Sequence, residues 1–296
     1  MTNTNTATTV PEPKHQFGAG YLYHYHPSYQ DYAPRLAEAG GRVDIYEVLG
    51  VQFNSEPDAI ETFAASLEKP VTLHSFEYCL GNVQRPPEKV TGRIQELARR
   101  SKAAYIGEHL AMMGTRDTYC GGFFQPPGTD EQTRVIIDNV KAAKNNSVCP
   151  VIVENPSQFY NEVGGRTIGR QMKEVAEAAD VGILLSLSNI TISERFRPQD
   201  REAFLAEIPL QRVRQLHALC GNQAEERMQG MEQSRREQEW IISMLQQLAR
   251  SPALQPAAVI FELEAGTPSM AEPERLRDFM DMARDLYFRD GKQRAA

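Results

Sequence analysis

The chain has 296 residues, a length that fits two medium domains or one large domain such as a single α/β barrel. Hydrophobic residues make up 41% and charged residues 24%, as in an ordinary soluble globular protein. The net charge of −7 excludes a general nucleic-acid-binding surface. No apolar run approaches the roughly 18 residues that a membrane span needs, so we also expect no membrane partner.

The ends of the chain are polar. We predict a disordered tail over residues 1–15, one domain over 16–290 and a short tail over 291–296. The N-terminus has neither a basic nor an apolar segment of the kind found in signal peptides. No two cysteines have the spacing of a metal or redox pair, which indicates free thiols and a cytoplasmic protein.

Eight short runs rich in apolar, β-branched or aromatic residues predict strands. They cover residues 17–24, 43–49, 70–74, 103–109, 149–154, 181–187, 213–217 and 256–262. Helical patterns alternate with them, over residues 28–39, 57–68, 87–101, 131–145, 166–178, 199–206, 225–250 and 272–288. We interpret Met112–Thr129, which follows the fourth strand, as a long loop that could gate a site.

This alternation predicts parallel strands joined by crossover helices, and eight such units predict a closed (β/α)8 TIM barrel. An open doubly wound sheet is the structural alternative. It is disfavoured because no GxGxxG segment and no phosphate-binding loop of the Walker type follows any predicted strand.

The fifth strand, within Cys149–Pro156, stops on Glu154 and Asn155. A carboxylate at the end of a buried strand is costly unless it is paired or binds a cation. Other strands repeat the pattern of an apolar run followed by histidine or glutamate. These residues are His24, His26, His74, Glu108, His109, Glu154, His217 and Glu262. In a barrel they would share the face on which such enzymes build their active sites.

Neutral imidazoles and carboxylates together suit iron, manganese or zinc at an open site. We therefore predict a metal site made from His74, His109, Glu154, His217 and Glu262. A bridging glutamate can hold two metals at roughly 3.5–4 Å. The metal-free alternative is a general acid–base site, with Glu108 or Glu154 as the base and a histidine as the acid.

Six segments, in order along residues 17–265, resemble the DUF692 (UPF0276) family. Leu73–Gly81 is similar to "LHG…LSLG", and Gly107–Leu110 is similar to "S-[DE]-H-L". Pro150–Pro156 is similar to a hydrophobic strand ending in "ENxS". The other three are Gly182–Asn189, similar to "GLLLDVNN", Arg212–His217, similar to "RVxxIHLAGH", and Ile260–Glu262, similar to "LIEWD".

The resemblance implies a xylose-isomerase-like barrel with a multinuclear non-haem iron site that uses O2, as in methanobactin biosynthesis. It implies a substrate cysteine in a ribosomally made peptide, presented by a partner protein. His74, His109 and Glu154 would hold one iron, and Glu154 would bridge to a second held by His217 and Glu262. Two irons are expected, although one or three remain open. Glu108 would transfer protons, and the expected substrate contacts are Asn155, Asn189, His24 and His26.

This chain departs from the family pattern at several positions. Ser186 stands where the family has aspartate, and Ser188 where it has the first asparagine. The second histidine of "IHLAGH" and the following "DTH" have no counterpart, and Val51–Phe53 replaces "ENY". The second iron would lack one anionic ligand, which His24 and His26 could replace. Two other hypotheses stay open: a metal-dependent sugar isomerase or epimerase, and a non-catalytic barrel that binds a peptide or a partner.

Overall fold

The structure is a computed structural model that describes residues 16–115, 118–196, 201–221, 230–263, 267, 269 and 272–288. The predicted tails, residues 1–15 and 291–296, lie outside the described residues. Among the helices that the structure describes, none is both long and apolar enough to cross a membrane.

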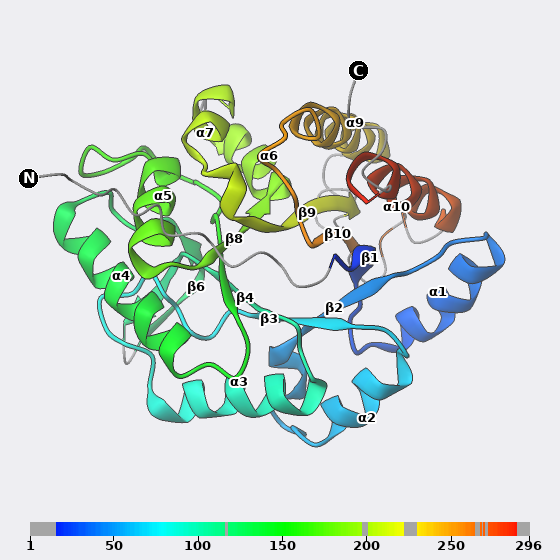
Figure 1. The fold of residues 1–296 in the computed structure, drawn as a ribbon, viewed down its shortest axis with the longest axis horizontal. Helices are drawn as coiled ribbons and strands as arrows, with labels where there is room; N and C mark the ends of the chain where they lie inside the picture. The colour runs from blue at the N-terminus through cyan, green and yellow to red at the C-terminus, as the bar shows by residue number, and fades with distance from the viewer. Residues whose placement is uncertain are drawn as a thin grey trace, which may run out of the picture.

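Eight parallel strands close into a barrel, which confirms the predicted (β/α)8 fold (Figure 1). Around the barrel they follow the order β1-β10-β9-β8-β7-β4-β3-β2. Their bounds are β1 Gly18–Leu22, β2 Ile45–Leu49, β3 Val71–Ser75, β4 Ile106–His109, β7 Val151–Glu154, β8 Gly182–Ser186, β9 Val213–Gly221 and β10 Ala258–Leu263. The predicted strand positions are therefore correct to within a few residues, except at the longer end of β9.

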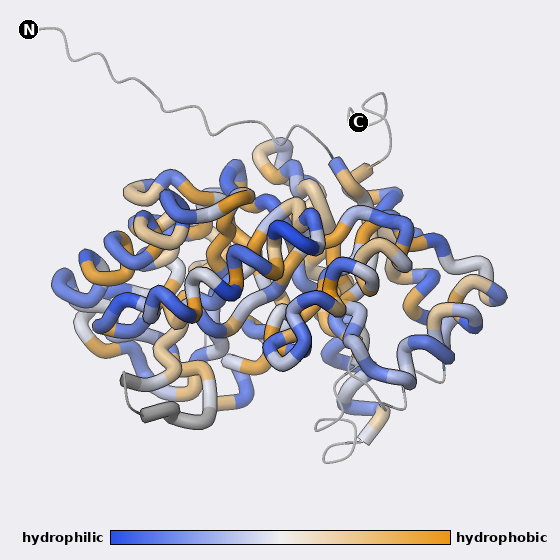
Figure 2. Tube along the Cα trace, turned by 90° about the horizontal axis from the view of Figure 1, so that it is seen from below, coloured by the Kyte–Doolittle hydropathy of each residue, from blue (hydrophilic) through white to orange (hydrophobic). Residues whose placement is uncertain are grey.

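Helices surround the strands on the outside, as Figure 1 shows. They are α1 Pro27–Glu38, α2 Ala59–Ser66, α3 Glu88–Ser101, α4 Asp130–Asn145, α5 Ile168–Ala179, α6 Leu187–Phe196, α7 Arg201–Glu207, α9 Met231–Leu248 and α10 Pro273–Tyr287. The described residues also include two short 3-10 turns, η1 Gly50–Phe53 and η2 Leu210–Arg212. Along the helices, hydrophilic and hydrophobic stretches alternate (Figure 2), as expected for helices that pack one face on a sheet.

Side chains along each strand point alternately into the barrel and out toward the helices. The interior near the start of the strands is apolar, with Ile152 and Leu184 in one buried cluster and Ile45 and Ile260 in another. Toward the carboxyl ends of the strands the inward side chains become polar. A shift of one residue in register would turn these polar groups out of the barrel, so the hydrophobic pattern also fixes the site.

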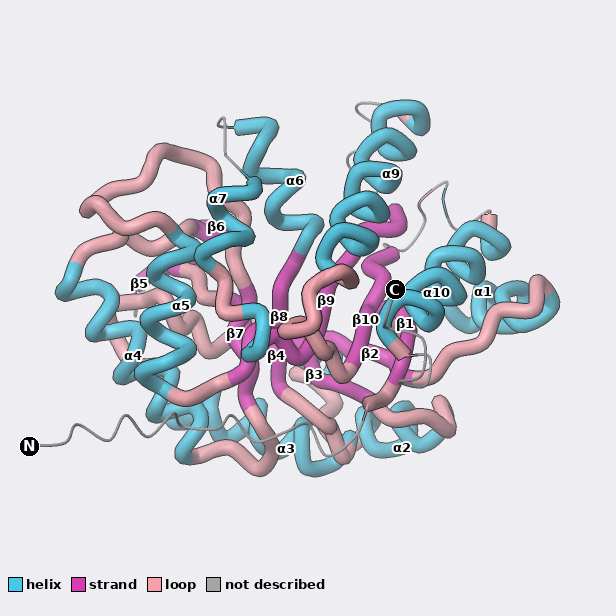
Figure 3. The backbone as a smooth tube through the Cα atoms, turned by 45° about the horizontal axis from the view of Figure 1, so that its top comes forward, coloured by secondary structure: helices cyan, strands magenta, loops and turns pink. Residues whose placement is uncertain are grey.

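The segment predicted as a long loop contains a β-hairpin, which corrects that expectation. Strands β5 (Met112–Thr115) and β6 (Thr118–Phe124) pair antiparallel, outside the barrel and beside α4 and α5 (Figure 3). Glycine is uncommon in strands, and Gly114, Gly121 and Gly122 obscured the pattern in the sequence. The hairpin folds over the end of β4.

The sequence also missed helix α6. The predicted strand over 181–187 ends at Ser186, and α6 begins at the next residue. The Ser186 hydroxyl accepts a hydrogen bond from the backbone N–H of Asn189 at 3.2 Å, so it caps the start of the helix. Of the predicted helix over 225–250, the structure shows α9, Met231–Leu248, while residues 225–229 lie outside the described residues.

Candidate metal centre

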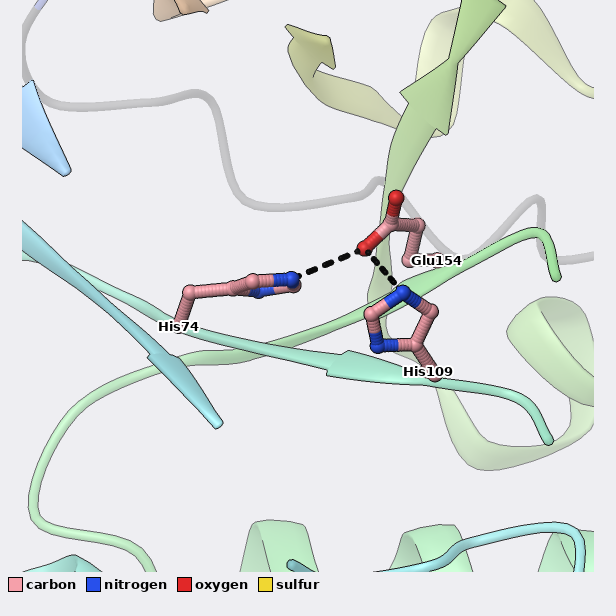
Figure 4. A group of neighbouring side chains, drawn as sticks. All are labelled: His74, His109 and Glu154. Atoms are coloured by element: carbon pink, nitrogen blue, oxygen red, sulfur yellow. Dashed lines mark ion pairs between the residues drawn. The ribbon is translucent and has the colours of Figure 1, made fainter. Parts of the chain in front are cut away.

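Three adjacent strands bring His74, His109 and Glu154 together. His109 of β4 pairs in register with Glu154 of β7, and Gly107 of β4 pairs with His74 of β3. The Nε2 atoms of both imidazoles lie 3.3 Å from the same atom, Glu154 Oε2 (Figure 4). Within the described residues, this is the group of three possible metal ligands whose donor atoms all lie within 4.8 Å of one another.

The other oxygen of Glu154 faces a second, looser group. His217 Nδ1 lies 3.5 Å from Glu154 Oε1 and 3.5 Å from Glu262 Oε1. The structure thus brings all five predicted metal ligands to one place. The two oxygens of Glu154 are divided between the two groups, as a bridging carboxylate requires.

A hydrogen-bonded chain fixes the Glu154 carboxylate. The Asn189 amide donates to Glu154 Oε1 at 3.1 Å and to the backbone carbonyl of Asn155 at 2.9 Å. The Ser157 hydroxyl donates in turn to Asn189 Oδ1 at 2.7 Å. Asn189 therefore occupies one face of Oε1 and orients the carboxylate, which leaves Oε2 for the two histidines.

The donor atoms of this centre fit a cation. Glu154 Oε2 and His217 Nδ1 are buried, and neither has a hydrogen-bond partner among the described residues. A buried polar atom without a partner costs free energy, and a metal ion in each of the two groups would satisfy these atoms. Two imidazoles with one carboxylate are also the ligands that open iron sites use.

Charges inside the cluster shift the pKa values of its members. Burial alone would raise the pKa of Glu154, but the neighbouring His109, His217 and His74 outweigh it and lower the pKa. Burial lowers the pKa of His109 to about 4, against the opposing effect of Glu154, so its imidazole is neutral near pH 7. A neutral imidazole is the form that binds metals.

His217 differs because carboxylates surround it. Burial would lower its pKa, but Glu47, Glu262 and Glu154 together raise it well above the ordinary value. In the absence of a metal, a proton on His217 thus supplies the positive charge that these carboxylates need. A metal at Nδ1 must displace that proton, so we expect binding there to release protons.

Glu108 lies on the other side of its strand, which argues against its predicted role in proton transfer. It pairs in register with Ser75, and both residues point away from the interior of the barrel. Its carboxylate accepts hydrogen bonds from the backbone N–H groups of Tyr78 at 3.0 Å and His109 at 3.1 Å. Burial raises its pKa well above the ordinary value, against the lowering effect of hydrogen bonds from the Tyr78 backbone, the Ser75 hydroxyl and the His109 backbone. Glu108 fixes the loop after β3.

Asn155 is also placed as a structural residue. It is 1% exposed, and its amide makes hydrogen bonds of 2.9 and 2.8 Å with the backbone carbonyl and N–H of Ser186. These bonds join the ends of β7 and β8 and leave it no free face for a substrate. Asn189, by contrast, lines a pocket beside the centre.

The two N-terminal histidines differ from each other. His26 is exposed and caps α1 through Ser28, so it is not positioned to replace a missing ligand. His24 stacks on Tyr29 with ring centroids 5.1 Å apart, and its Nε2 is buried without a hydrogen-bond partner among the described residues. Burial lowers its pKa to about 4, and Glu262 is the charge that opposes this shift. His24 therefore lies on the Glu262 side of the centre.

Glu47 is a residue of this centre that the sequence reading missed. It lies inside the barrel on β2, is fully buried, and its Oε1 is 2.8 Å from His217 Nε2. The sequence does contain a sign of this role. Glu47 is a charged residue within the largely apolar run 43–49, and a carboxylate buried there needs a partner.

A cavity of about 370 Å³ opens beside His109 and is walled mainly by aromatic rings. Phe123, from the hairpin, stacks on the His109 imidazole with ring centroids 4.4 Å apart and an angle of 28° between the planes. Phe124 and Phe159 complete the apolar wall, while Asn189 contributes a polar group. Few polar groups in an apolar cavity are typical of small-molecule and side-chain binding sites.

Solved structures with this fold include two sugar epimerases. D-psicose 3-epimerase of Clostridium cellulolyticum H10 with D-tagatose is 12% identical, with a TM-score of 0.52, over 90% of this chain and 96% of that chain. D-allulose 3-epimerase of Methylomonas sp. is 8% identical, with a TM-score of 0.58, over 91% of this chain and 98% of that chain. At such low identity these likenesses establish the xylose-isomerase-like barrel alone.

Related sequences are UPF0276 proteins. That of Anaeromyxobacter sp. (strain Fw109-5) is 27% identical over 149 residues, 50% of this chain and 53% of that protein. That of Rhizorhabdus wittichii RW1 is 24% identical over 217 residues, 73% of this chain and 76% of that protein. The chain thus spans about half the length of the first of these relatives.

Residues 28–284 match the family described as the RiPP precursor modification enzyme MbnB/TglH/ChrH, where RiPP denotes a ribosomally synthesised and post-translationally modified peptide. The match covers most of the barrel and confirms the family that the sequence segments predicted. This chain therefore belongs to the MbnB/TglH/ChrH family of RiPP precursor modification enzymes.

Proposed function

We propose that this protein is an iron-dependent, O2-using oxidoreductase that modifies a cysteine, or a related thiol, of a ribosomally made peptide. The observation that carries the proposal is the division of the two Glu154 oxygens between two groups of buried nitrogen and oxygen donors. Family membership supports the peptide substrate, and the donor set supports iron.

His74, His109 and Glu154 would hold one iron, and Glu154, His217 and Glu262 would hold the second. Iron bound there would supply the redox chemistry that couples thiol oxidation to the reduction of O2. The carboxylates match the positive charge of the metals, and the neutral His109 needs no deprotonation before it binds.

The cavity beside His109 offers a route by which a peptide side chain can reach the centre. Phe123 covers the His109 imidazole, so the hairpin excludes water from the first metal position. A thiol that enters between Phe124 and Phe159 passes Asn189, which is already fixed by Ser157. The hairpin thus takes the gating role expected of Met112–Thr129, and a partner protein that presents the peptide would dock around this opening.

The test is metal analysis of anaerobically purified protein, followed by O2 consumption with a cysteine-bearing peptide and its serine counterpart. We expect about two irons per chain and O2 uptake with the cysteine peptide alone. Less than one iron, with no O2 uptake after addition of Fe(II), contradicts the proposal. Activity toward a sugar with Mn(II) or Co(II) and no O2 would favour the isomerase alternative, although the aromatic cavity offers few groups for sugar hydroxyls.

A further inference from the structure

Glu47 forms a buried contact with the far side of the His217 ring. Glu47 Oε1 is 2.8 Å from His217 Nε2, while the opposite ring nitrogen, Nδ1, faces Glu154 and Glu262 at 3.5 Å. Both side chains are fully buried. Glu47 Oε1 is buried and has no hydrogen-bond partner among the described residues, so a proton on His217 Nε2, 2.8 Å away, would satisfy it.

The contact decides which nitrogen of His217 is available to a metal. Once a metal has displaced the Nδ1 proton, a proton held on Nε2 by Glu47 leaves the lone pair of Nδ1 pointing into the cluster. The Gln215 amide nitrogen lies 3.0 Å from the same Nε2 and would favour the opposite tautomer by donating to it. The carboxylate prevails because a charge-assisted hydrogen bond is roughly twice as strong as a neutral one, and its distance here is shorter.

The other oxygen of Glu47 is held independently. Oε2 accepts hydrogen bonds from the Gln215 amide and, at 3.3 Å, from the Thr72 hydroxyl. Side chains from two other strands, β3 and β9, therefore hold this carboxylate. Such an arrangement leaves Glu47 no contact with a substrate, and its Oε1 is directed at His217 alone among the described residues.

We propose that Glu47 is a positioning residue, which orients His217 and presents its Nδ1 atom to the second metal. This inference rests on the proposed function, because it needs a metal between His217, Glu154 and Glu262. It assigns to β2 a role in the centre that the five predicted ligands did not include. A carboxylate behind a metal-binding histidine is a general means of fixing the ring and raising its basicity.

The test is an anaerobic titration of the metal-free protein with Fe(II), read by the number of ions bound and their affinities. In Glu47→Gln, binding of the second Fe(II) should weaken by about 10–100-fold, the usual effect of losing such a partner. Binding of the first, at His74, His109 and Glu154, should stay within about twofold. The matched control is Glu237→Gln, a buried acid that pairs with Arg195 outside the barrel and should bind both ions like the wild type.

Thermal unfolding of each metal-free variant shows whether it folds. If Glu47→Gln does not fold, Glu47→Asp is used instead. The aspartate keeps the charge, but its shorter side chain does not reach His217, so the second Fe(II) should also bind more weakly to this variant. Two ions bound with unchanged affinity in the folded Glu47 variant would overturn this inference and leave the proposed function standing. An equal weakening of both ions would overturn it as well. A wild type that binds no Fe(II) would overturn the proposed function and the inference together.

Discussion

Gly107 gives the His74 imidazole the space that it occupies. A Cβ atom at Gly107 would stand 3.1 Å from His74 Nδ1 and 3.0 Å from the Leu184 side chain. The His74 ring has little freedom to retreat, because Phe76, His109 and His217 all pack against it with centroids 5.0 to 5.4 Å away. The glycine in β4 therefore determines where the Nε2 atom of His74 lies.

Gly107→Ala should weaken binding of the first metal by about tenfold, because a displacement of a few tenths of an ångström moves His74 Nε2 off its ligand position. The measurement is the Fe(II) affinity of the metal-free variant. Gly92→Ala is the matched control, because a Cβ there meets nothing within 4 Å. That change should leave metal binding intact and stabilise α3 by about 1 kcal/mol. Equal Fe(II) affinities for the two variants would contradict the prediction.

His24 should make the stability of the metal-free protein depend on pH. Burial lowers its pKa from 6.5 to about 4, so between these values the unfolded chain binds the proton and the folded protein does not. Stability from this residue is therefore present above pH 6.5 and is lost as the pH falls toward 4, by at most about 3 kcal/mol. His24→Phe keeps the ring stacked on Tyr29 without titrating. Between pH 7 and 5, the free energy of unfolding measured in urea should fall less for the variant than for the wild type. An equal fall in both proteins would contradict the assignment of this pH dependence to His24.

The aromatic cavity should contribute to peptide binding without affecting the metals. Phe159→Ala removes one wall of the cavity, and the ring of Phe159 packs edge-on against Phe196. We expect a loss of about 1 kcal/mol of binding, which is roughly a fivefold rise in KM for the peptide, with unchanged iron content. Val83→Ala, at a residue that is 68% exposed and does not line the cavity, is the control and should change neither quantity. A parallel loss of iron in Phe159→Ala would show that the ring supports the centre instead.

Strand ends made much of this centre predictable, because a histidine or carboxylate that closes an apolar run must find a partner in the interior. His74, His109 and Glu154 were found in this way. Glu47 was missed because residues 43–49 carry apolar side chains and one carboxylate on each face, and only the register with β1 and β3 shows which face points inward. Helix α6 was missed because its β-branched residues resemble a continuing strand, whereas a cap from Ser186 and packing against β9 make it helical.

Ser186→Asp should restore an anionic ligand to the second metal position. Ser186 pairs in register with His217 and is fully buried, so an aspartate there would face the same interior while still capping α6. In the metal-free protein the new carboxylate adds to the negative charge around Glu154 and should lower stability by about 1–3 kcal/mol. With Fe(II) bound, the same charge should strengthen the second site by about tenfold, because affinity rises with the number of charged ligands. Ser186→Asn, similar in size but uncharged, is the control for both effects. If the aspartate and asparagine variants bind the second Fe(II) with the same affinity, position 186 does not contribute to the metal centre.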